Sequence, residues 1–415
     1  MNPKHSKEYS SEILKKKFKG EELTEEEIKL LVEDILNGKL GEAEIAYFIS
    51  GQKFQGMSDK EIYFLTKAMI DTGKTINFGK KIISDKHCIG GVPGNRTTPL
   101  VVPICISEGL TIPKTSSRAI TSPAGTADVI ETIANIEISG EKVKKLIKTK
   151  GGCMIWNSEA KLSPADDKII QVEKILQLDI PSQLVASVLS KKISIGSKNI
   201  LIDIPYGKGS KVLNVGQAKR LKKLFLTVGK RFGVKIRVVL TDGRRPIGNG
   251  IGPVLEMLDI LKILKGEKGY AKDLAKKSIF LSSELLKLNS VKNPGLKARK
   301  ALKSGKAYEK FKSIINAQNN NRDFDKKVLK LKLGKFSKEI VAGTTGRIKN
   351  IDNEKLSYLC RILGCPKNKG AGVYLHRKKG FLVKGTKLIT LYSEDKQLLS
   401  QGIEYFWENN VVRLG

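Results

Sequence analysis

Residues 85–98 read D-K-H-C-I-G-G-V-P-G-N-R-T-T and gather charged residues, glycines and hydroxyl groups in one short stretch. Glycines allow the backbone to approach a ligand closely, and several backbone N–H groups can then converge on one anion. Lys86 adds a positive charge, and the helix expected to begin near Pro99 adds the favourable end of its dipole. The stretch therefore predicts a bound oxyanion, most naturally a phosphate, although a glycine-rich turn without a ligand explains it equally well. It matches neither the P-loop nor the Rossmann glycine pattern.

A second stretch of the same character is S-S-R-A-I-T-S-P-A-G-T-A-D-V-I-E at residues 116–131. Serine and threonine favour the start of a helix for purely structural reasons, so an ordinary N-cap cluster is one interpretation. The other is a second wall of the same anion site, in which Ser116, Ser117 and Thr126 donate hydroxyl hydrogens. The sequence pattern alone leaves both interpretations open.

Helix signals dominate residues 1–75, which predict a small helical domain. Thr24 and Glu27 have the spacing of a capping box, and the apolar residues that follow fall on one helical face. Gly38 is a typical helix end. Ser58 opens a further helix with the same start signal.

From about residue 80, short apolar runs end in Gly/Pro-rich loops and alternate with helical segments, which predicts a largely parallel sheet covered by helices. The last part of the chain alternates polar and apolar residues and turns on glycines, which predicts a small β-rich domain. Residues 317–327 have the composition of a polar connector. The predicted fold class is α/β: a small all-helical domain, a large mixed or parallel-sheet α/β domain and a small C-terminal β-rich domain. The expected segments are 1–75 (helical), 76–160 (α/β), 161–195 (return to the helical domain), 196–330 (α/β) and 331–415 (β-rich).

Composition narrows the possible partners. The chain has 76 Lys and Arg against 42 Asp and Glu, a formal charge of +34, which favours anionic ligands. The basic residues are spread along the whole chain without interleaved aromatic residues, so no nucleic acid partner is expected. No apolar run approaches the roughly 20 residues that span a bilayer, and the N-terminus has no secretory h-region. We therefore expect a cytoplasmic protein without a membrane partner. Five scattered cysteines and three histidines give no reason to expect a metal site.

Together, the stretches at 85–98 and 116–131 resemble the thymidine/pyrimidine-nucleoside phosphorylase family. Only Pro123 departs from the family's pattern in the second stretch, where Thr or Ala is usual. Pro123 and the additional residue in G-G-V-P-G-N resemble the AMP phosphorylase branch. Further matches to that branch are D-I-P-S-Q-L-V-A-S-V-L-S-K-K (179–192), I-D-I-P-Y-G-K-G-S-K (202–211) and D-G-R-R-P-I-G-N-G-I-G-P (242–253).

The resemblance implies phosphorolysis of nucleoside 5′-monophosphates, in which AMP and phosphate give adenine and ribose 1,5-bisphosphate. CMP and UMP are further candidate substrates, and phosphorolysis of unphosphorylated pyrimidine nucleosides is the alternative. Phosphate is a co-substrate in this reaction, and no cofactor or metal is expected. AMP phosphorylases usually carry an extra N-terminal domain implicated in assembly, and this chain starts at the helical domain, so a homodimer is expected rather than a large oligomer.

The resemblance also implies roles for individual residues. Asp179 would protonate the leaving base, which requires a pKa above the usual value of about 3.9; as an alternative, Asp179 is only the N-cap of a helix. His87 is a second catalytic candidate, or a loop histidine that fixes its neighbours. Lys211 is a partner for the 5′-phosphate or an ordinary surface charge. The implied substrate- and phosphate-binding residues are Lys86, Gly90, Gly91, Ser116, Ser117, Arg118, Ala119, Ile120, Thr121, Ser122, Thr126, Ser187, Lys191 and Lys211.

Two further departures from the family affect affinity. Cys88 stands where the family typically has Ser, and Gln171 stands where an Arg is expected. Because the anion stretches belong to the predicted α/β domain, whereas Asp179, Ser187 and Lys191 belong to the segment returning to the helical domain, we also expect a cleft that closes on the substrate.

Overall fold

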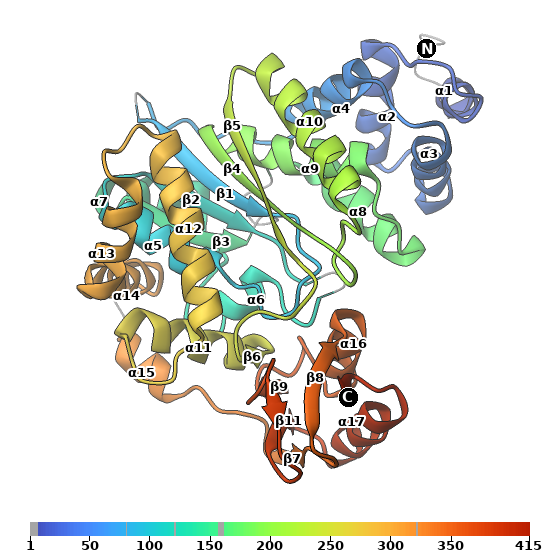
Figure 1. Ribbon diagram of the computed structural model, residues 1–415. Helices are drawn as coiled ribbons and strands as arrows, with labels where there is room; N and C mark the ends of the chain where they lie inside the picture. Colours follow the sequence, from blue (N-terminus) through green and yellow to red (C-terminus); the bar gives the residue numbers. More distant parts are fainter. Residues whose placement is uncertain (1–6, 80, 120–121, 157–161, 321–322) are drawn as a thin grey trace. The chain divides into compact units, whose positions relative to one another are not determined.

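The computed structural model describes residues 7–79, 81–119, 122–156, 162–320 and 323–415 (Figure 1). Of the predicted site residues, Ile120 and Thr121 lie outside these ranges. The chain divides into two compact units. The helical unit comprises residues 1–85, 157–200 and 219–238, and the α/β unit comprises residues 86–156, 201–218 and 239–415. The domain boundaries expected from the sequence stay predictions.

The helical unit packs its helices around one apolar core that includes Ile28, Phe48 and Leu65. The capping box is confirmed: the Thr24 side chain accepts from Glu27 N at 3.2 Å, and the Glu27 carboxylate accepts from Thr24 N at 2.7 Å. These local signals fix where the helices begin. The helices are α1 (Lys7–Phe18), α2 (Glu25–Asn37), α3 (Glu42–Gln55), α4 (Asp59–Asp71), α8 (Pro164–Leu176), α9 (Pro181–Ser194) and most of α10 (Val215–Arg231).

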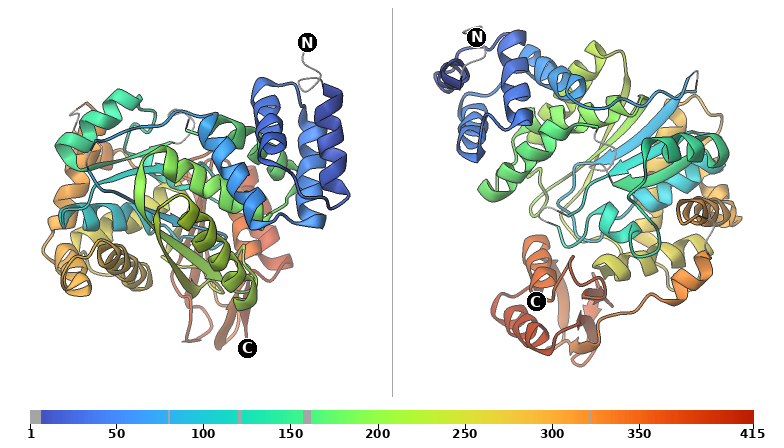
Figure 2. Two further views of the ribbon diagram at one scale, coloured as in Figure 1. Left: turned by 90° about the horizontal axis from the view of Figure 1, so that it is seen from above. Right: turned by 180° about the vertical axis from the view of Figure 1, so that it is seen from behind.

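Three strands form one sheet in the order β1-β4-β5, and the division between the units crosses each of them. A second pair, β2 and β3, is parallel, and Ser116 lies opposite Trp156 at its end. Helices α5 and α7 pack against this pair (Figure 2). The strands are β1 (Ile83–Cys88), β2 (Ile112–Ser116), β3 (Gly152–Trp156), β4 (Ser197–Tyr206) and β5 (Lys235–Asp242).

Helices of the α/β unit share a large apolar core, and α5 is buried along its whole length because α12 and α14 pack against it. Pro and Gly residues set several helix ends; α11, for example, begins with a proline after Gly252, whose φ is 127°. The helices are α5 (Thr98–Ser107), α6 (Thr126–Ile130), α7 (Gly140–Lys150), α11 (Pro253–Lys265), α12 (Lys272–Leu288), α13 (Pro294–Lys303), α14 (Lys306–Gln318) and α15 (Phe324–Leu329).

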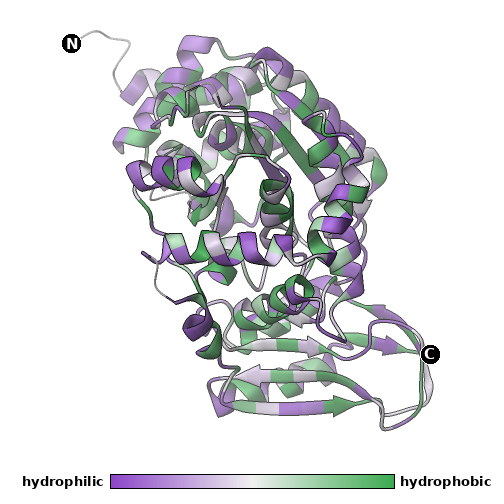
Figure 3. Ribbon diagram, turned by 90° about the vertical axis from the view of Figure 1, so that its left-hand side faces the viewer, coloured by the Kyte–Doolittle hydropathy of each residue, from purple (hydrophilic) through white to green (hydrophobic). Residues whose placement is uncertain are grey.

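The C-terminal region of the α/β unit contains two antiparallel sheets, in the orders β6-β9-β11-β7 and β10-β8-β12. Buried and exposed residues alternate along β8, and Figure 3 shows hydrophobic and hydrophilic residues alternating in these strands. The predicted fold class is therefore confirmed. The elements are β6 (Gly250–Ile251), β7 (Phe336–Val341), β8 (Gly346–Ile351), α16 (Asn353–Ile362), β9 (Gly372–Leu375), β10 (Phe381–Leu382), β11 (Lys387–Ser393), α17 (Lys396–Glu408) and β12 (Val412–Leu414).

The predicted polar connector at 317–327 is wrong for most of its described residues. Helix α14 continues to Gln318, whose buried side-chain amide donates to Met154 O at 2.9 Å and accepts from Met154 N at 2.8 Å. Phe324 begins α15 and is fully buried. The Asn319 side chain is likewise satisfied inside the fold, because it donates to Ile133 O and accepts from Asn135 N, both at 2.8 Å. Asn320, Asp323 and the polar residues 325–327 are exposed. Within the described ranges, no helix is long and apolar enough to cross a membrane.

Candidate active site

The first candidate stretch begins inside a strand. Strand β1 includes Lys86, His87 and Cys88. Lys86 is only 1% exposed, and its Nζ donates to Thr97 Oγ1 at 2.6 Å. Burial lowers the pKa of Lys86. Since the Thr97 oxygen accepts from the ammonium group, the Thr97 hydroxyl can direct its own hydrogen to a further acceptor. His87 is half-buried beside it.

Two glycines turn the chain after β1. Gly90 and Gly91 have φ values of 93° and 87°, which favour glycine at both positions. A Cβ at Gly91 would lie 2.4 Å from Lys211 N, so Gly91 packs directly against the loop that carries Lys211. A Cβ at Gly90 would have no described atom within 4 Å, so this side of the turn is open. At Gly94 a Cβ would lie 2.1 Å from Ile247 O. Three loops of the α/β unit thus meet at this turn.

The second candidate stretch is held in shape by a single carboxylate. Asp128 Oδ2 accepts from the N–H groups of Ala119 and Gly125, both at 2.8 Å. Ser122 Oγ donates to Ala124 O at 2.9 Å. Ser116, at the end of β2, is buried, and its hydroxyl oxygen has no hydrogen-bond partner among the described residues. A buried hydroxyl without a protein partner is suited to bind a ligand or water. Ser117 is exposed.

Arg118 is engaged by acidic side chains. Its guanidinium donates to both Glu131 oxygens at 2.8 and 2.7 Å and lies 4.6 Å from the centre of the Trp156 ring. The hydrogen bond from Arg118 lowers the pKa of Glu131 to about 2. Lys369 also binds Glu131, at 2.6 Å. The charge of Arg118 is therefore balanced by protein carboxylates, and its predicted contact with the nucleotide stays a prediction.

Arg96 joins the two candidate stretches. Its Nε lies 2.6 Å from Glu256 Oε2, its Nη1 donates to Thr126 Oγ1 at 3.1 Å, and its Nη2 donates to Ala124 O. Arg96 was not among the predicted site residues, although it lies inside the first stretch. No local signal could have paired it with Glu256, which lies 160 residues later in the chain.

On β4, the strand beside β1, the buried carboxylate of Asp203 contacts three side chains. Cys88 Sγ lies 3.3 Å from Asp203 Oδ2, Thr241 Oγ1 donates to Oδ1 at 2.6 Å, and Lys277 Nζ lies 3.1 Å from Oδ2. Burial, and then the charge of Asp203, raise the pKa of Cys88, so this residue remains a thiol. In place of the serine expected from the resemblance, Cys88 directs a weak donor to Asp203.

In the helical unit, Ser187 and Lys191 lie one turn apart on α9, and both contact Asp166. Lys191 Nζ lies 2.6 Å from Asp166 Oδ2, and Ser187 Oγ donates to the same oxygen at 2.7 Å. Burial lowers and the Asp166 and Asp167 carboxylates raise the pKa of Lys191, and the net direction is upward. Asp166 could not be recognised from the sequence, because an aspartate in the first turn of a helix is common for electrostatic reasons alone.

Asp179, the predicted acid, is exposed, as is Gln171. The N-cap of α9 is Ile180, so Asp179 precedes the helix and is not its N-cap residue. The burial expected of Asp179 is therefore not found in the protein alone.

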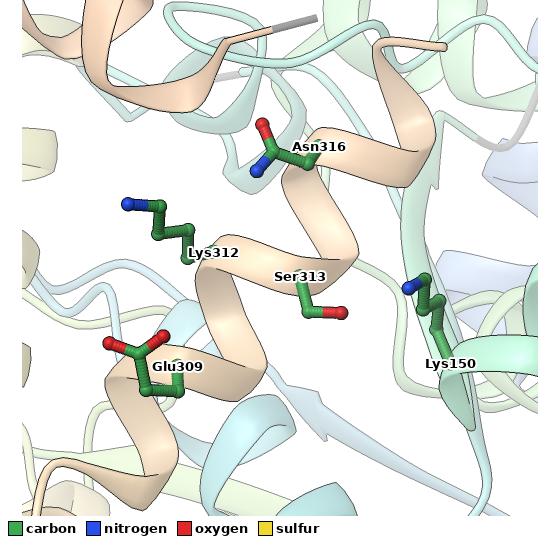
Figure 4. A pocket seen from close by; sticks show the side chains of 5 residues that line it. All are labelled: Lys150, Glu309, Lys312, Ser313 and Asn316. Atoms are coloured by element: carbon green, nitrogen blue, oxygen red, sulfur yellow. The ribbon is translucent and has the colours of Figure 1, made fainter. Parts of the chain in front are cut away.

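A surface hollow of about 350 Å³ lies along α14 and the end of α7 (Figure 4). None of the described candidate residues lines it; its lining is Lys150, Glu309, Lys312, Ser313 and Asn316. Over the described part of the chain, no group of three or more His, Cys, Asp or Glu side chains could hold a metal ion.

Comparison with known proteins places the N-terminal helical region and the α/β region of the chain in one family. Residues 11–73 match the helical bundle domain, and residues 80–308 the a/b domain, of a glycosyl transferase family. The chain is 40% identical over 397 residues to AMP phosphorylase 1 of Archaeoglobus fulgidus, covering 95% of this chain and 78% of that one. It is 43% identical over 382 residues to a Legionella pneumophila protein named "Putative thymidine phosphorylase", covering 91% of this chain and 72% of that one.

Solved structures with the same fold are more distant in sequence. Anthranilate phosphoribosyltransferase from Thermus thermophilus superposes with a TM-score of 0.60 at 19% identity, over 74% of this chain and 99% of that one. The Saccharomyces cerevisiae enzyme of the same name, in complex with PRPP and Mg, gives a TM-score of 0.62 at 14% identity, over 76% of this chain and 99% of that one. At these identities the likeness concerns the fold alone.

Proposed function

This chain belongs to the glycosyl transferase family that has a helical bundle domain and an a/b domain, and we propose that it is a phosphorylase acting on nucleoside 5′-monophosphates. In the proposed reaction, AMP and phosphate give adenine and ribose 1,5-bisphosphate. The relatives named AMP phosphorylase support this substrate class. CMP and UMP are further candidate substrates.

The observation that carries the proposal is that Arg96, in the first candidate stretch, binds Thr126 and Ala124 of the second. Three hydroxyl groups of these stretches are suited to donate to an oxyanion: Thr97 and Thr126, whose oxygens accept from Lys86 and Arg96, and Ser116, whose oxygen has no partner among the described residues. The open side of Gly90 leaves room beside them. Hydroxyl and ammonium donors in a buried setting favour a phosphate because they replace its hydration.

The chemistry then requires two events at the sugar. A phosphate oxygen forms a bond to C1′ while the bond from C1′ to the base nitrogen breaks, and the base nitrogen takes up a proton. Asp179 is the proposed proton donor, with His87 as the second candidate. Because Asp179 is exposed in the free protein, the scheme requires bound substrate to cover its carboxyl group.

The base and the 5′-phosphate have separate proposed partners. Ser187 and Lys191, both fixed by Asp166, are proposed to bind the base. Lys211, which adjoins Gly91, is proposed to bind the 5′-phosphate. No cofactor is required in this scheme, because phosphate itself is the second substrate. The protein is proposed to be a cytoplasmic homodimer.

The alternative function is phosphorolysis of unphosphorylated pyrimidine nucleosides, and the similarity to proteins named as thymidine phosphorylases favours it. The test incubates the purified chain with AMP, CMP, UMP, thymidine or uridine, with and without phosphate, and follows release of the base. We expect phosphate-dependent release from AMP, abolished in Asp179→Asn and Lys86→Ala. Release from thymidine or uridine alone would establish the alternative, and no phosphate-dependent release from any of them would overturn both.

A further inference from the structure

We propose that Arg96 is a positioning residue for the phosphate co-substrate, which it serves by orienting the Thr126 hydroxyl and holding the two candidate stretches together. The inference rests on the proposed function for the identity of the ligand. Neither the sequence motifs nor the resemblance identified Arg96 as a functional residue.

The guanidinium of Arg96 is fixed on three sides. It donates to Glu256, to Thr126 and to the backbone oxygen of Ala124, and its side chain is 13% exposed. Glu256 is itself held in place, because it lies in the first turn of α11 and accepts from Gly252 N at 3.3 Å. Arg96 and Glu256 are therefore both held in fixed positions, and the second stretch contacts Arg96 through Thr126 and Ala124.

The contact with Arg96 sets the orientation of the Thr126 hydroxyl group. Its Oγ1 accepts from Arg96 Nη1, so the hydroxyl hydrogen points away from the guanidinium and is available as a donor. An oxyanion needs donors, and a threonine without this contact is free to rotate. Within the first stretch, the Thr97 oxygen likewise accepts from Lys86 Nζ, so the Thr97 hydroxyl is also available as a donor.

The charge of Arg96 contributes little by itself. Glu256 lies 2.6 Å from its Nε and is 1% exposed, so the pair is close to neutral. A role through charge alone would be cancelled by Glu256, whereas a role through geometry survives this pairing. Arg96 should therefore affect the binding of phosphate and leave the binding of the nucleotide nearly unchanged.

The test measures KM for phosphate and KM for the nucleotide in the full chain carrying Arg96→Met or Arg96→Lys, and phosphate binding by calorimetry without any nucleotide. Losing one hydrogen bond to a charged group is expected to raise KM for phosphate about tenfold in Arg96→Met. Arg96→Lys keeps one hydrogen-bond donor of the three contacts, so it should recover part of this loss. KM for the nucleotide should stay within about twofold in both variants.

The matched control is Lys142→Met. Lys142 also bridges two segments of the α/β unit, because it donates to Gln318 O at 2.9 Å and to Asn320 Oδ1 at 2.7 Å, and it belongs to neither stretch. Its loss should leave both KM values unchanged.

Equal changes in the two KM values, or no change in phosphate binding by Arg96→Met and Arg96→Lys, would overturn the inference. If Arg96→Met does not fold, Arg96→Lys alone decides, since unchanged phosphate binding in that variant would also overturn it. A wild-type chain that binds phosphate, loses this binding in the Arg96 variants and cleaves no nucleotide would refute the proposed function and leave the role of Arg96 standing.

Discussion

Lys191 and Asp166 form a buried ion pair in which Nζ lies 2.6 Å from Oδ2. Ser187 donates its hydroxyl hydrogen to the same oxygen, and Gln183 donates to Oδ1 at 3.2 Å. Because the Ser187 hydrogen is used, its oxygen is left to accept, while the ammonium group of Lys191 can still donate. This part of α9 thus offers an acceptor beside a donor, which suits the edge of a nucleobase.

The first prediction follows from this arrangement. Asp166→Asn keeps the size of the side chain and removes its charge, so Lys191 loses the nearer of its two carboxylate partners and the contact that orients Ser187 is weakened. We expect KM for the nucleotide to rise about tenfold, as for one lost charged hydrogen bond, with KM for phosphate unchanged. Steady-state kinetics with each substrate varied in turn measures both constants.

Asp167→Asn is the matched control for Asp166→Asn. Asp167 lies 3.5 Å from Lys191 Nζ and its side chain is one-third exposed, so its loss should have a much smaller effect. A rise in KM for phosphate in Asp166→Asn would contradict the proposal that Ser187 and Lys191 bind the base and not the phosphate.

A second prediction concerns alkaline pH. Burial lowers the pKa of Lys86 below the ordinary lysine value of 10.5, so its ammonium group loses its proton at a lower pH than an exposed lysine would. A phosphate ligand binds the charged form. We therefore expect kcat/KM for phosphate to fall as pH rises, and this fall to begin below 10.5.

Lys86→Arg provides the control, because a guanidinium keeps its charge throughout this range. The alkaline fall in kcat/KM for phosphate should disappear in Lys86→Arg even if its value at neutral pH is reduced. An unchanged alkaline fall in this variant would assign the titration to another group.

The third prediction concerns acid stability. Hydrogen bonding to Arg118 lowers the pKa of Glu131 from 4.5 to about 2, so the folded state favours the charged carboxylate. The stabilisation is present above the unfolded pKa of 4.5 and is lost as pH falls towards about 2. Glu131→Gln should therefore lower the free energy of unfolding by about 1 kcal/mol at neutral pH, a small effect because the pair is partly exposed.

Urea unfolding of wild type and Glu131→Gln as a function of pH measures this effect. The two curves should converge as pH falls from 4.5 towards about 2. A difference that stays constant over this interval would show that Glu131 acts through packing and not through its charge.

Local signals made the helical unit predictable, whereas the contacts at the candidate site join distant parts of the chain. The capping box at Thr24 depends on residues three positions apart, and the structure confirms it. The pairing of Arg96 with Glu256 depends on how α11 packs, which no local pattern encodes. Gln318 was misassigned for the related reason that its polar side chain is satisfied inside the fold by Met154.

The last prediction concerns Gly90 and Gly91, which share a positive φ but differ in what an added Cβ would meet. Both have a positive φ, so an alanine at either position is strained by about 1 kcal/mol. A Cβ at Gly91 would also lie 2.4 Å from Lys211 N, whereas a Cβ at Gly90 enters space open of described atoms. We expect Gly91→Ala to lower the melting temperature more than Gly90→Ala does.

Gly90→Ala instead places a methyl group where the phosphate is proposed to bind, so it should raise KM for phosphate with only a modest loss of stability. If both variants lose stability equally and Gly90→Ala keeps the wild-type KM, then the turn at Gly90 does not face the phosphate.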